Sequence, residues 1–363
     1  MSAAPIRTAS RAEIAHNKPW ILNEDIEAVS ASLGTGWLAP GARVAGLEDD
    51  MARLLGGGTA CAVSSGTAAL MLALKGAGIV RGDRVAVPTY VCTAVLNAVV
   101  ACNATPVPVD IDRNSFNLDP KALEALGDKP KAAVVVHTYG AEAPIDALHK
   151  HADIVIEDCC QSLGAISGGM AIGRSGQAAI FSFYATKIVT GGHGGLVFAA
   201  SGRIPDFARD YITFDGRDDW KPRFNFQMTD FQAALVQKQL RRLDAIKRRR
   251  RALAAKYRAA LLNGYSVQSG LDRDGMLPYR FVIVTPDQTV RDRLRKHFDA
   301  NAIRTIVPLE RKELLHRELG LAADRFANAE QVVDTTLSIP LYPALSDDEA
   351  SRIVEALQKA PAP

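Results

Sequence analysis

Long apolar runs, paired cysteines and excess charge are all missing from this 363-residue sequence. No stretch of about 18 uninterrupted apolar residues occurs, so we expect no membrane span. Residues 1–20 lack the apolar core of a secretory signal. The five cysteines form no C-x-x-C pair, so we expect no metal site, and their apolar surroundings predict buried free thiols in a reducing compartment. Together these absences predict a cytoplasmic protein.

The formal net charge is only +3, which is small for a chain of this size. The one dense basic cluster runs from Lys247 to Arg251, and it follows leucines and isoleucine at helical spacing. We interpret this run as the solvated face of a long helix, in preference to a nucleic-acid or localisation signal. No nucleic-acid partner is therefore expected.

Short β-branched runs alternate with helical patterns through the middle of the chain, which is typical of a parallel sheet covered by helices. The runs are apolar throughout, as strands buried on both faces must be. The pattern predicts an α/β fold: a three-layer αβα large domain with a mostly parallel seven-stranded sheet, and a smaller C-terminal α+β domain. The candidate strands are Ala60–Val63, Arg84–Val87, Thr105–Val109, Ala132–His137, Ile154–Asp158, Ala179–Phe183 and Leu196–Ala199; helix candidates between them are Thr67–Gly76, Thr93–Ala101 and Pro120–Leu126.

Beyond this region, one long helical stretch is expected from Thr229 to about Leu262, with Thr229 or Asp230 as its cap. A strand over Tyr279–Val284 and helices over Thr289–Asn301 and Ser346–Lys359 follow. We place the domain boundaries at 1–40 for an N-terminal arm and substrate loop, 41–240 for the large, cofactor-binding domain and 241–363 for the small domain.

Three segments carry side chains suited to chemistry. The run Ser64–Ala68 (SSGTA) opens a helix after a strand, where free backbone N–H groups can bind an anion, although simple N-capping is the preferred explanation of this run on its own. Glu157 and Asp158 end a buried strand, where a carboxylate is either salt-bridged for structure or paired with a metal, a base or a cationic ring.

Lys187 is the third feature, because it follows an apolar strand and precedes a glycine-rich turn. Most lysines are solvated surface groups, but a desolvated lysine is readily deprotonated and attacks aldehydes, and burial is expected to disfavour its charge. An anion site, a carboxylate and a lysine together suit pyridoxal 5′-phosphate (PLP), which offers a phosphate, a ring nitrogen and an aldehyde. A nicotinamide-dependent enzyme is disfavoured because no G-x-G-x-x-G follows the first strand.

At this point the sequence resembles the DegT-like sugar aminotransferases (DegT/DnrJ/StrS type) of PLP fold type I. The similar segments follow the family's order from residue 36 to residue 347: GWLAPGARVAGLED, VSSGTAALMLAL, VAVPTYVCTAVLNAVVACNATPVPVDID, HTYGAEAPI, VIEDCCQSLGA, FSFYATKIVTGGHGGLV, RFNFQMTDFQAALVQKQL and LSIPLYPALSD.

The resemblance implies a role for each matching residue. Lys187 would hold the cofactor as a Schiff base and shuttle the proton, Asp158 would pair with the pyridinium nitrogen, and Gln161 would bond the 3-hydroxyl. The phosphate would be held by Gly66, Thr67, Ala68 and Ser182, and by Asn225 from the neighbouring subunit of a homodimer.

Two positions depart from the family pattern. Cys92 stands where an aromatic residue usually stacks on the pyridine ring, so either Tyr90 compensates or stacking is weaker. His193 replaces the acidic residue of the glycine-rich turn, and it either alters the charge near the substrate or only bonds the backbone. Some family members are dehydratases with histidine in place of the lysine, which the presence of Lys187 argues against.

The implied reaction is a two-step transamination in which glutamate or glutamine converts the cofactor to pyridoxamine 5′-phosphate. That form then aminates a keto-sugar, expected to be nucleotide-linked, in amino-sugar or lipopolysaccharide biosynthesis. A non-nucleotide keto-sugar or a cyclitol is the alternative acceptor, and a non-catalytic PLP-binding regulator is the rival from another class. Expected substrate contacts are Trp37, Tyr184, His193, Arg217 and Tyr342, and Arg223 and the 247–251 run are candidates for a pyrophosphate.

Overall fold

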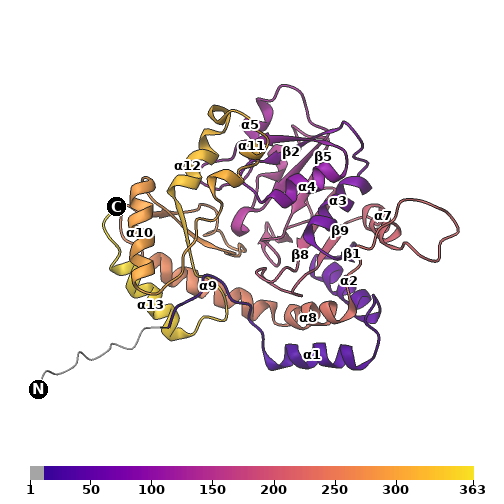
Figure 1. Cartoon of the computed structure of the whole chain (residues 1–363), viewed down its shortest axis with the longest axis horizontal. Helices are drawn as coiled ribbons and strands as arrows, with labels where there is room; N and C mark the ends of the chain where they lie inside the picture. Colours follow the sequence, from indigo (N-terminus) through magenta and orange to yellow (C-terminus); the bar gives the residue numbers. More distant parts are fainter. Residues whose placement is uncertain (1–11) are drawn as a thin grey trace, which may run out of the picture.

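The computed structural model describes residues 12–363 and is built on a seven-stranded sheet (Figure 1). The strands lie in the order β1-β9-β8-β5-β4-β2-β3, and only β9 runs antiparallel to its neighbours. This confirms the predicted mostly parallel sheet and the α/β fold class. Its strands are β1 (Thr59–Val63), β2 (Arg84–Pro88), β3 (Thr105–Val109), β4 (Ala132–Val136), β5 (Ile154–Asp158), β8 (Ala178–Ser182) and β9 (Gly195–Ala199).

Helices cover both faces of this sheet, because successive strand residues point to opposite sides. Val134 and Ile156 face a core shared with α3, α4 and α7, whereas Val135 and Val155 face a core shared with α5 and α6. Helices α2 and α8 pack on a further core on this second side. The helices are α2 (Ala42–Leu54), α3 (Gly66–Gly76), α4 (Thr93–Ala101), α5 (Pro120–Glu124), α6 (Ile145–Leu148), α7 (Arg203–Ile212) and α8 (Asp230–Leu240).

A three-stranded antiparallel sheet, β10-β11-β12, forms in the last third of the chain. Its core includes Tyr257, Phe281 and Phe298. Helices α9, α10 and α13 contribute to this core, and Figure 1 shows them together away from the large sheet. The elements are α9 (Leu243–Ala260), β10 (Ser266–Val267), β11 (Phe281–Val284), α10 (Gln288–Ala300), α11 (Leu315–Glu318), α12 (Ala327–Thr335), β12 (Thr336–Ile339) and α13 (Asp347–Gln358); a hairpin of β6 (Ile166–Ser167) and β7 (Met170–Ala171) lies apart.

Two expectations about local structure need correction. The stretch predicted as one helix from Thr229 to Leu262 is two helices, α8 and α9, which break at Arg241 and Arg242. The Arg242 guanidinium binds the buried Asp25 carboxylate and the Trp20 carbonyl, contacts that no local pattern announces. Asp25 belongs to α1 (Asn23–Gly34), a helix within the segment expected to be an arm and loop, and α1 lies along α8 (Figure 1).

The basic run at 247–251 is not uniformly solvated either. Arg250 is only 2% exposed, and its guanidinium donates to the carbonyl oxygens of Tyr279 and Leu341. Arg248 is exposed, as the prediction of a solvated face requires.

No helix within residues 12–363 combines the length and the apolar character that crossing a membrane requires. The domain boundaries placed at residues 40 and 240 stay a prediction.

Candidate active site

The start of helix α3 lies directly against the end of strand β8. Ser65 caps the helix, since its Oγ accepts the Ala68 N–H at 3.1 Å. A Cβ added to Gly66 would stand 2.9 Å from Ser182 Cβ and 3.4 Å from Cys160 Sγ. Only glycine allows this approach, and the N–H groups of a first helical turn have no partner within the helix. The predicted phosphate residues Gly66, Thr67, Ala68 and Ser182 are therefore close together.

Asp158 shares a sheet face with Ser182 and the start of α3. Ile156 and Ile180 belong to the core beneath α3, and the two-residue period of a strand places Asp158 and Ser182 on that same side. Asp158 is 7% exposed, and its Oδ1 accepts the Cys160 N–H at 3.0 Å. A buried carboxylate at the carboxyl end of a parallel strand is thus available to a cation.

Lys187 lies in the turn after β8, where its N–H donates to the Tyr184 carbonyl at 2.9 Å. Its Nζ stands 5.4 Å from the centroid of the Tyr279 ring. Burial by itself would lower the pKa of Lys187, but Tyr279, Cys160, Asp158 and Cys92 outweigh it, and the net pKa is raised. Burial therefore disfavours the charge of this lysine, as expected, but its neighbours reverse the net effect for the free amine.

Gln161 and Tyr139 form the next part of the site. The Gln161 Oε1 accepts the Tyr139 N–H at 2.7 Å, which directs the amide NH₂ group toward other acceptors. The Tyr139 hydroxyl donates to the Tyr90 hydroxyl at 3.1 Å, and Tyr90 also packs against Phe116. Tyr90 is 2% exposed and packs within this aromatic cluster, so its ring is not free to stack on a pyridine ring in place of Cys92. Of the two alternatives, weaker stacking on the cofactor is therefore favoured.

Most of the remaining predicted residues lie at the surface. Trp37 and Tyr184 are 59% and 48% exposed, and the Tyr184 ring meets the His193 ring edge-on at 5.4 Å. Asn225 is exposed. The backbone carbonyl of its neighbour Phe226 accepts the N–H of Ser64, which directly precedes the start of α3.

Two of the predicted arginines are paired with a carboxylate, and one predicted tyrosine is buried. Arg217 and Arg223 both pair with Asp210, so their charge is at least partly neutralised within the chain. Tyr342 is 2% exposed in the core of the small sheet, and its ring therefore offers little surface to a substrate.

Sequence reasoning missed the groups on the other side of Lys187. Tyr279 is 6% exposed and is contacted by Lys187, Arg250 and Arg280. Burial favours a high pKa for its phenol, but these cations and the Thr186 hydroxyl bring the pKa of Tyr279 below its ordinary value. The only hint in the sequence is the pair Tyr279-Arg280 at the head of an otherwise apolar run, YRFVIV.

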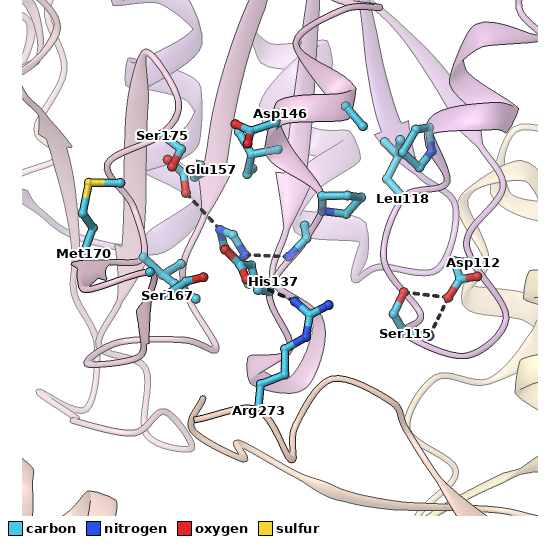
Figure 2. Close-up of a pocket in the computed structure, with 18 of the residues that line it drawn as sticks. Asp112, Ser115, Leu118, His137, Asp146, Glu157, Ser167, Met170, Ser175 and Arg273 are labelled. Atoms are coloured by element: carbon cyan, nitrogen blue, oxygen red, sulfur yellow. Dashed lines mark hydrogen bonds and ion pairs between the residues drawn. The ribbon is translucent and has the colours of Figure 1, made fainter. Parts of the chain in front are cut away.

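A cavity of about 710 Å³ opens on the opposite face of β5, where Glu157 points (Figure 2). His137 lies beside Glu157, with its Nε2 3.1 Å from Oε2, and its Nδ1 accepts the Ala143 N–H. The Gly173 and Gly176 N–H groups complete the bonding of Glu157. Among residues 12–363, His137, Glu157 and Cys159 place ligand atoms within 4.8 Å of one another. Since hydrogen bonds already engage both imidazole nitrogens, we interpret this trio as structural support for β5.

The residues present fit pyridoxal phosphate. Gly66 leaves space that a single Cβ would fill at the start of α3, which is where a phosphate can meet backbone N–H groups. On the same face lie a buried carboxylate, Asp158, and the amine of Lys187, whose pKa that carboxylate helps to raise. One side of the sheet end therefore offers an anion site, a partner for a cationic ring nitrogen and a nucleophile for an aldehyde.

Comparison with known proteins gives consistent matches over nearly the whole chain. The model of the DegT/DnrJ/EryC1/StrS aminotransferase family matches residues 19–358. The spore coat polysaccharide biosynthesis protein SpsC of Bacillus subtilis (strain 168) is 31% identical, over 94% of this chain and 96% of that protein.

Solved structures give the same fold. DesV of S. venezuelae, crystallised with a ketimine intermediate, matches with a TM-score of 0.85 and 31% identity over 93% of this chain and 94% of its own. A putative sugar aminotransferase of Streptococcus pneumoniae, Spr1654, in its PMP form, matches with a TM-score of 0.88 over 96% of this chain and 97% of its own; at 21% identity it supports the fold alone.

Proposed function

The chain belongs to the DegT/DnrJ/EryC1/StrS aminotransferase family and is a PLP-dependent sugar aminotransferase, and from this premise we propose that it moves the amino group of glutamate or glutamine to a nucleotide-linked keto-sugar. The observation that supports this proposal best is the convergence of Lys187, Asp158 and the start of α3 on one face of the sheet.

We assign the chemical steps to these residues. Lys187 would carry the cofactor, and once released by the donor its neutral amine would take the proton from the donor's α-carbon as a base. In the second half-reaction its ammonium would give a proton to the substrate carbon as an acid. Asp158 keeps the ring nitrogen protonated, because a buried carboxylate stabilises an adjacent cation. Gln161 donates its amide N–H to the 3-hydroxyl, and Gly66, Thr67, Ala68 and Ser182 hold the phosphate. When bound, PLP supplies the aldehyde that accepts the amino group and a ring that takes up the electron pair released at the substrate carbon.

The acceptor is the less constrained part of the proposal. Trp37, Tyr184 and His193 are exposed and can contact sugar hydroxyls, and we keep them as proposed substrate residues together with Arg217. A non-nucleotide keto-sugar or a cyclitol stays the alternative acceptor. Lys187 argues against the histidine-dependent dehydratases of the family. The retention of the lysine, the carboxylate and the phosphate-binding helix start together argues against a non-catalytic regulator.

We further propose a homodimer in which Asn225 of each subunit reaches the phosphate of the other. Support comes from exposure: Asn225 is at the surface, Phe224 is 50% exposed and Trp220 is 89% exposed, a degree unusual for tryptophan outside an interface. The five free cysteines are consistent with a reducing, cytoplasmic compartment.

The decisive experiment loads the protein with pyridoxamine phosphate and screens keto-sugars by mass spectrometry for a product carrying the amino group. Lys187→Ala should lose both the visible absorbance of lysine-bound cofactor and turnover. Lys296→Ala, an exposed lysine of α10, should keep both and serves as the matched control. Turnover by Lys187→Ala at the wild-type rate would refute the assignment.

Addition of glutamate separates an enzyme from a regulator. An enzyme converts bound PLP to pyridoxamine phosphate and loses the visible absorbance, whereas a regulator retains its cofactor unchanged. Retention of the absorbance with glutamate, glutamine and every other amino acid would reject the transaminase.

A further inference from the structure

Tyr279, which lies shortly before strand β11, places its ring against the amine of Lys187. The Lys187 Nζ stands over this ring, 5.4 Å from its centroid, and Tyr279 is only 6% exposed. None of the ion pairs among residues 12–363 includes Lys187, so no carboxylate oxygen shares the amine with the ring at contact distance. The negative face of an aromatic ring attracts a cation, and the attraction is larger where water is excluded. The ring therefore stabilises a positive charge on Lys187 by direct contact.

Backbone and side-chain contacts fix the ring of Tyr279. Its N–H donates to the Tyr139 carbonyl at 2.9 Å, and its hydroxyl lies 3.5 Å from the Thr186 Oγ1. Thr186 directly precedes Lys187, so the ring is anchored to the turn that carries the lysine. Tyr139 in turn donates its N–H to Gln161, the proposed partner of the cofactor's 3-hydroxyl. The position of the ring relative to the lysine is thus set by the same network that holds Gln161.

Two guanidinium groups contact the same ring. The guanidinium carbons of Arg250 and Arg280 stand 6.0 and 5.5 Å from its centroid. Arg250 also donates to the Tyr279 carbonyl at 3.1 Å, and the Nε of each arginine has no hydrogen-bond partner among residues 12–363. An aromatic side chain suits this position, because its ring attracts the cations that surround it.

The remaining charges around Lys187 are less able to stabilise an ammonium ion when the cofactor is bound. Burial lowers the pKa of this lysine, but four neighbours outweigh burial and raise it: Tyr279, Cys160, Asp158 and Cys92. Burial raises the pKa of both thiols, so they carry no charge at neutral pH. Asp158 is the proposed partner of the cofactor's ring nitrogen, so bound PLP engages its charge. The ring of Tyr279 is then the neighbour that stays available to the lysine.

We propose that Tyr279 is a positioning residue for Lys187, whose ring face stabilises the lysine as an ammonium ion once the donor has released it from the cofactor. This makes the released amine a stronger base toward the donor's α-carbon. The carbon–hydrogen bond breaks, the proton joins the Lys187 nitrogen, and the electron pair is left to the cofactor. The inference rests on the proposed aminotransferase function and adds a residue that sets the base strength of the lysine.

Attachment of PLP tests the ring contact without an amino-acid substrate. Only the neutral amine attacks an aldehyde, and loss of a cation–π contact shielded from water lowers the pKa of the amine by about one unit. Tyr279→Leu should therefore speed the attachment of PLP to the cofactor-free protein about tenfold at pH 7, measured by stopped-flow absorbance. Tyr279→Phe keeps the ring and should match the wild type. A variant that only damages the site would instead slow attachment.

The donor half-reaction should change in the opposite direction. In single turnovers with glutamate, Tyr279→Leu should lower the limiting rate about tenfold, because a lower pKa makes Lys187 a weaker base. The glutamate concentration that gives half of this rate should stay unchanged, and Tyr279→Phe should react as the wild type does. Tyr265→Leu removes another buried tyrosine, from the core of the small sheet, and serves as the matched control with both rates unchanged.

A fluorinated ring separates the charge of the ring face from the shape of the side chain. Phenylalanine with three fluorines on its ring, placed at position 279, fills nearly the same space as phenylalanine but has less negative charge on the ring face. It should therefore attach PLP faster and react with glutamate more slowly than Tyr279→Phe. This variant keeps the test available if Tyr279→Leu does not fold.

The outcomes separate this inference from the proposed function. If Tyr279→Phe changes both rates as Tyr279→Leu does, the hydroxyl acts on Lys187 instead of the ring face, and the inference fails. It also fails if Tyr279→Leu and the fluorinated variant attach PLP no faster than the wild type. If the wild type attaches PLP but reacts with no amino acid, the proposed function is wrong, while the attachment rates still decide whether the ring stabilises the charge of Lys187.

Discussion

Substitution of Gly66 by alanine tests the cofactor site through one methyl group. Gly66 is the first residue of α3 and its φ lies outside the left-handed region, so the backbone accepts alanine without strain. The added Cβ would stand 2.9 Å from Ser182 Cβ and 3.3 Å from Ser182 Oγ. The Ser182 Cβ is fixed to strand β8 and cannot turn away as the tip of a flexible side chain would.

The magnitude follows from two opposing terms. Overpacking of this kind costs about 1–3 kcal/mol, whereas alanine in a helix gains up to about 1 kcal/mol over glycine. We expect Gly66→Ala to lower the free energy of unfolding by about 1 kcal/mol. Because relief of the contact moves the start of α3 away from β8, the affinity for PLP should fall at least about tenfold, which corresponds to about 1.4 kcal/mol.

Gly34→Ala is the matched control. Gly34 is the last residue of α1, and a Cβ there would meet nothing within 4 Å. This substitution should raise the free energy of unfolding by about 0.5–1 kcal/mol and leave the affinity for PLP unchanged.

The assays are urea unfolding of the cofactor-free protein and titration with PLP followed by visible absorbance. If Gly66→Ala matched Gly34→Ala in both, the close approach of α3 to β8 would not be what forms the phosphate site, and the reasoning would be refuted.

Three further predictions concern charge and pH. The raised pKa of Lys187 keeps its amine protonated at neutral pH, and only the neutral amine attacks an aldehyde; the rate of cofactor attachment should therefore rise up to about tenfold per pH unit above about pH 7, and a flat profile in stopped-flow absorbance would contradict this. Glu157→Ala should lower the free energy of unfolding measured in urea by about 3–5 kcal/mol, because it leaves His137 and two backbone N–H groups buried without their acceptor. Glu157→Gln should lower it less, and equal losses would argue against the pairing of Glu157 with His137. Burial lowers the pKa of His316 to about 4, so below about pH 6.5 the unfolded chain binds a proton that the folded chain does not. As the pH is lowered from about 6.5 to about 4, the Tm should therefore fall. It should fall less steeply in His316→Gln, and equal slopes would contradict this.

The regular elements of the large sheet could be read from local pattern. The strand Ile154–Asp158 and the helix Thr93–Ala101 end where the sequence predicts. A strand buried on both faces gives a short continuous apolar run, and this run is easy to recognise in the sequence. Where tertiary contacts decide, the pattern fails. The long helix expected after Thr229 is interrupted at Arg241 and Arg242, and the guanidinium of Arg242 binds the Asp25 carboxylate at this break.

Charged side chains were the least predictable part. The aspartate of the site stands at the end of a strand and the lysine in the turn after another strand, at the sheet edge where topology concentrates ligand-binding residues, so Lys187 and Asp158 could be selected from the sequence. Arg250 was predicted to be solvated because its neighbours are basic, yet it is buried and its Nη1 donates to backbone carbonyls of distant segments. The sequence marks Arg280 only as a charge at the head of an apolar run, because its environment depends on the rings of Tyr139 and Tyr279, which adjoin two different sheets.

The sequence by itself determined which chemistry is present: an anion-binding helix start, a carboxylate and a lysine, in an order that indicates one cofactor. The tertiary structure decided which of the cations are neutralised and which remain free. Local pattern follows from the period of helices and strands, whereas the neutralisation of a charge depends on groups far away in the chain. Arg280 meets the rings of both Tyr139 and Tyr279 only because the segment before β11 bonds the turn after β4, through the Tyr279 N–H and the Tyr139 carbonyl.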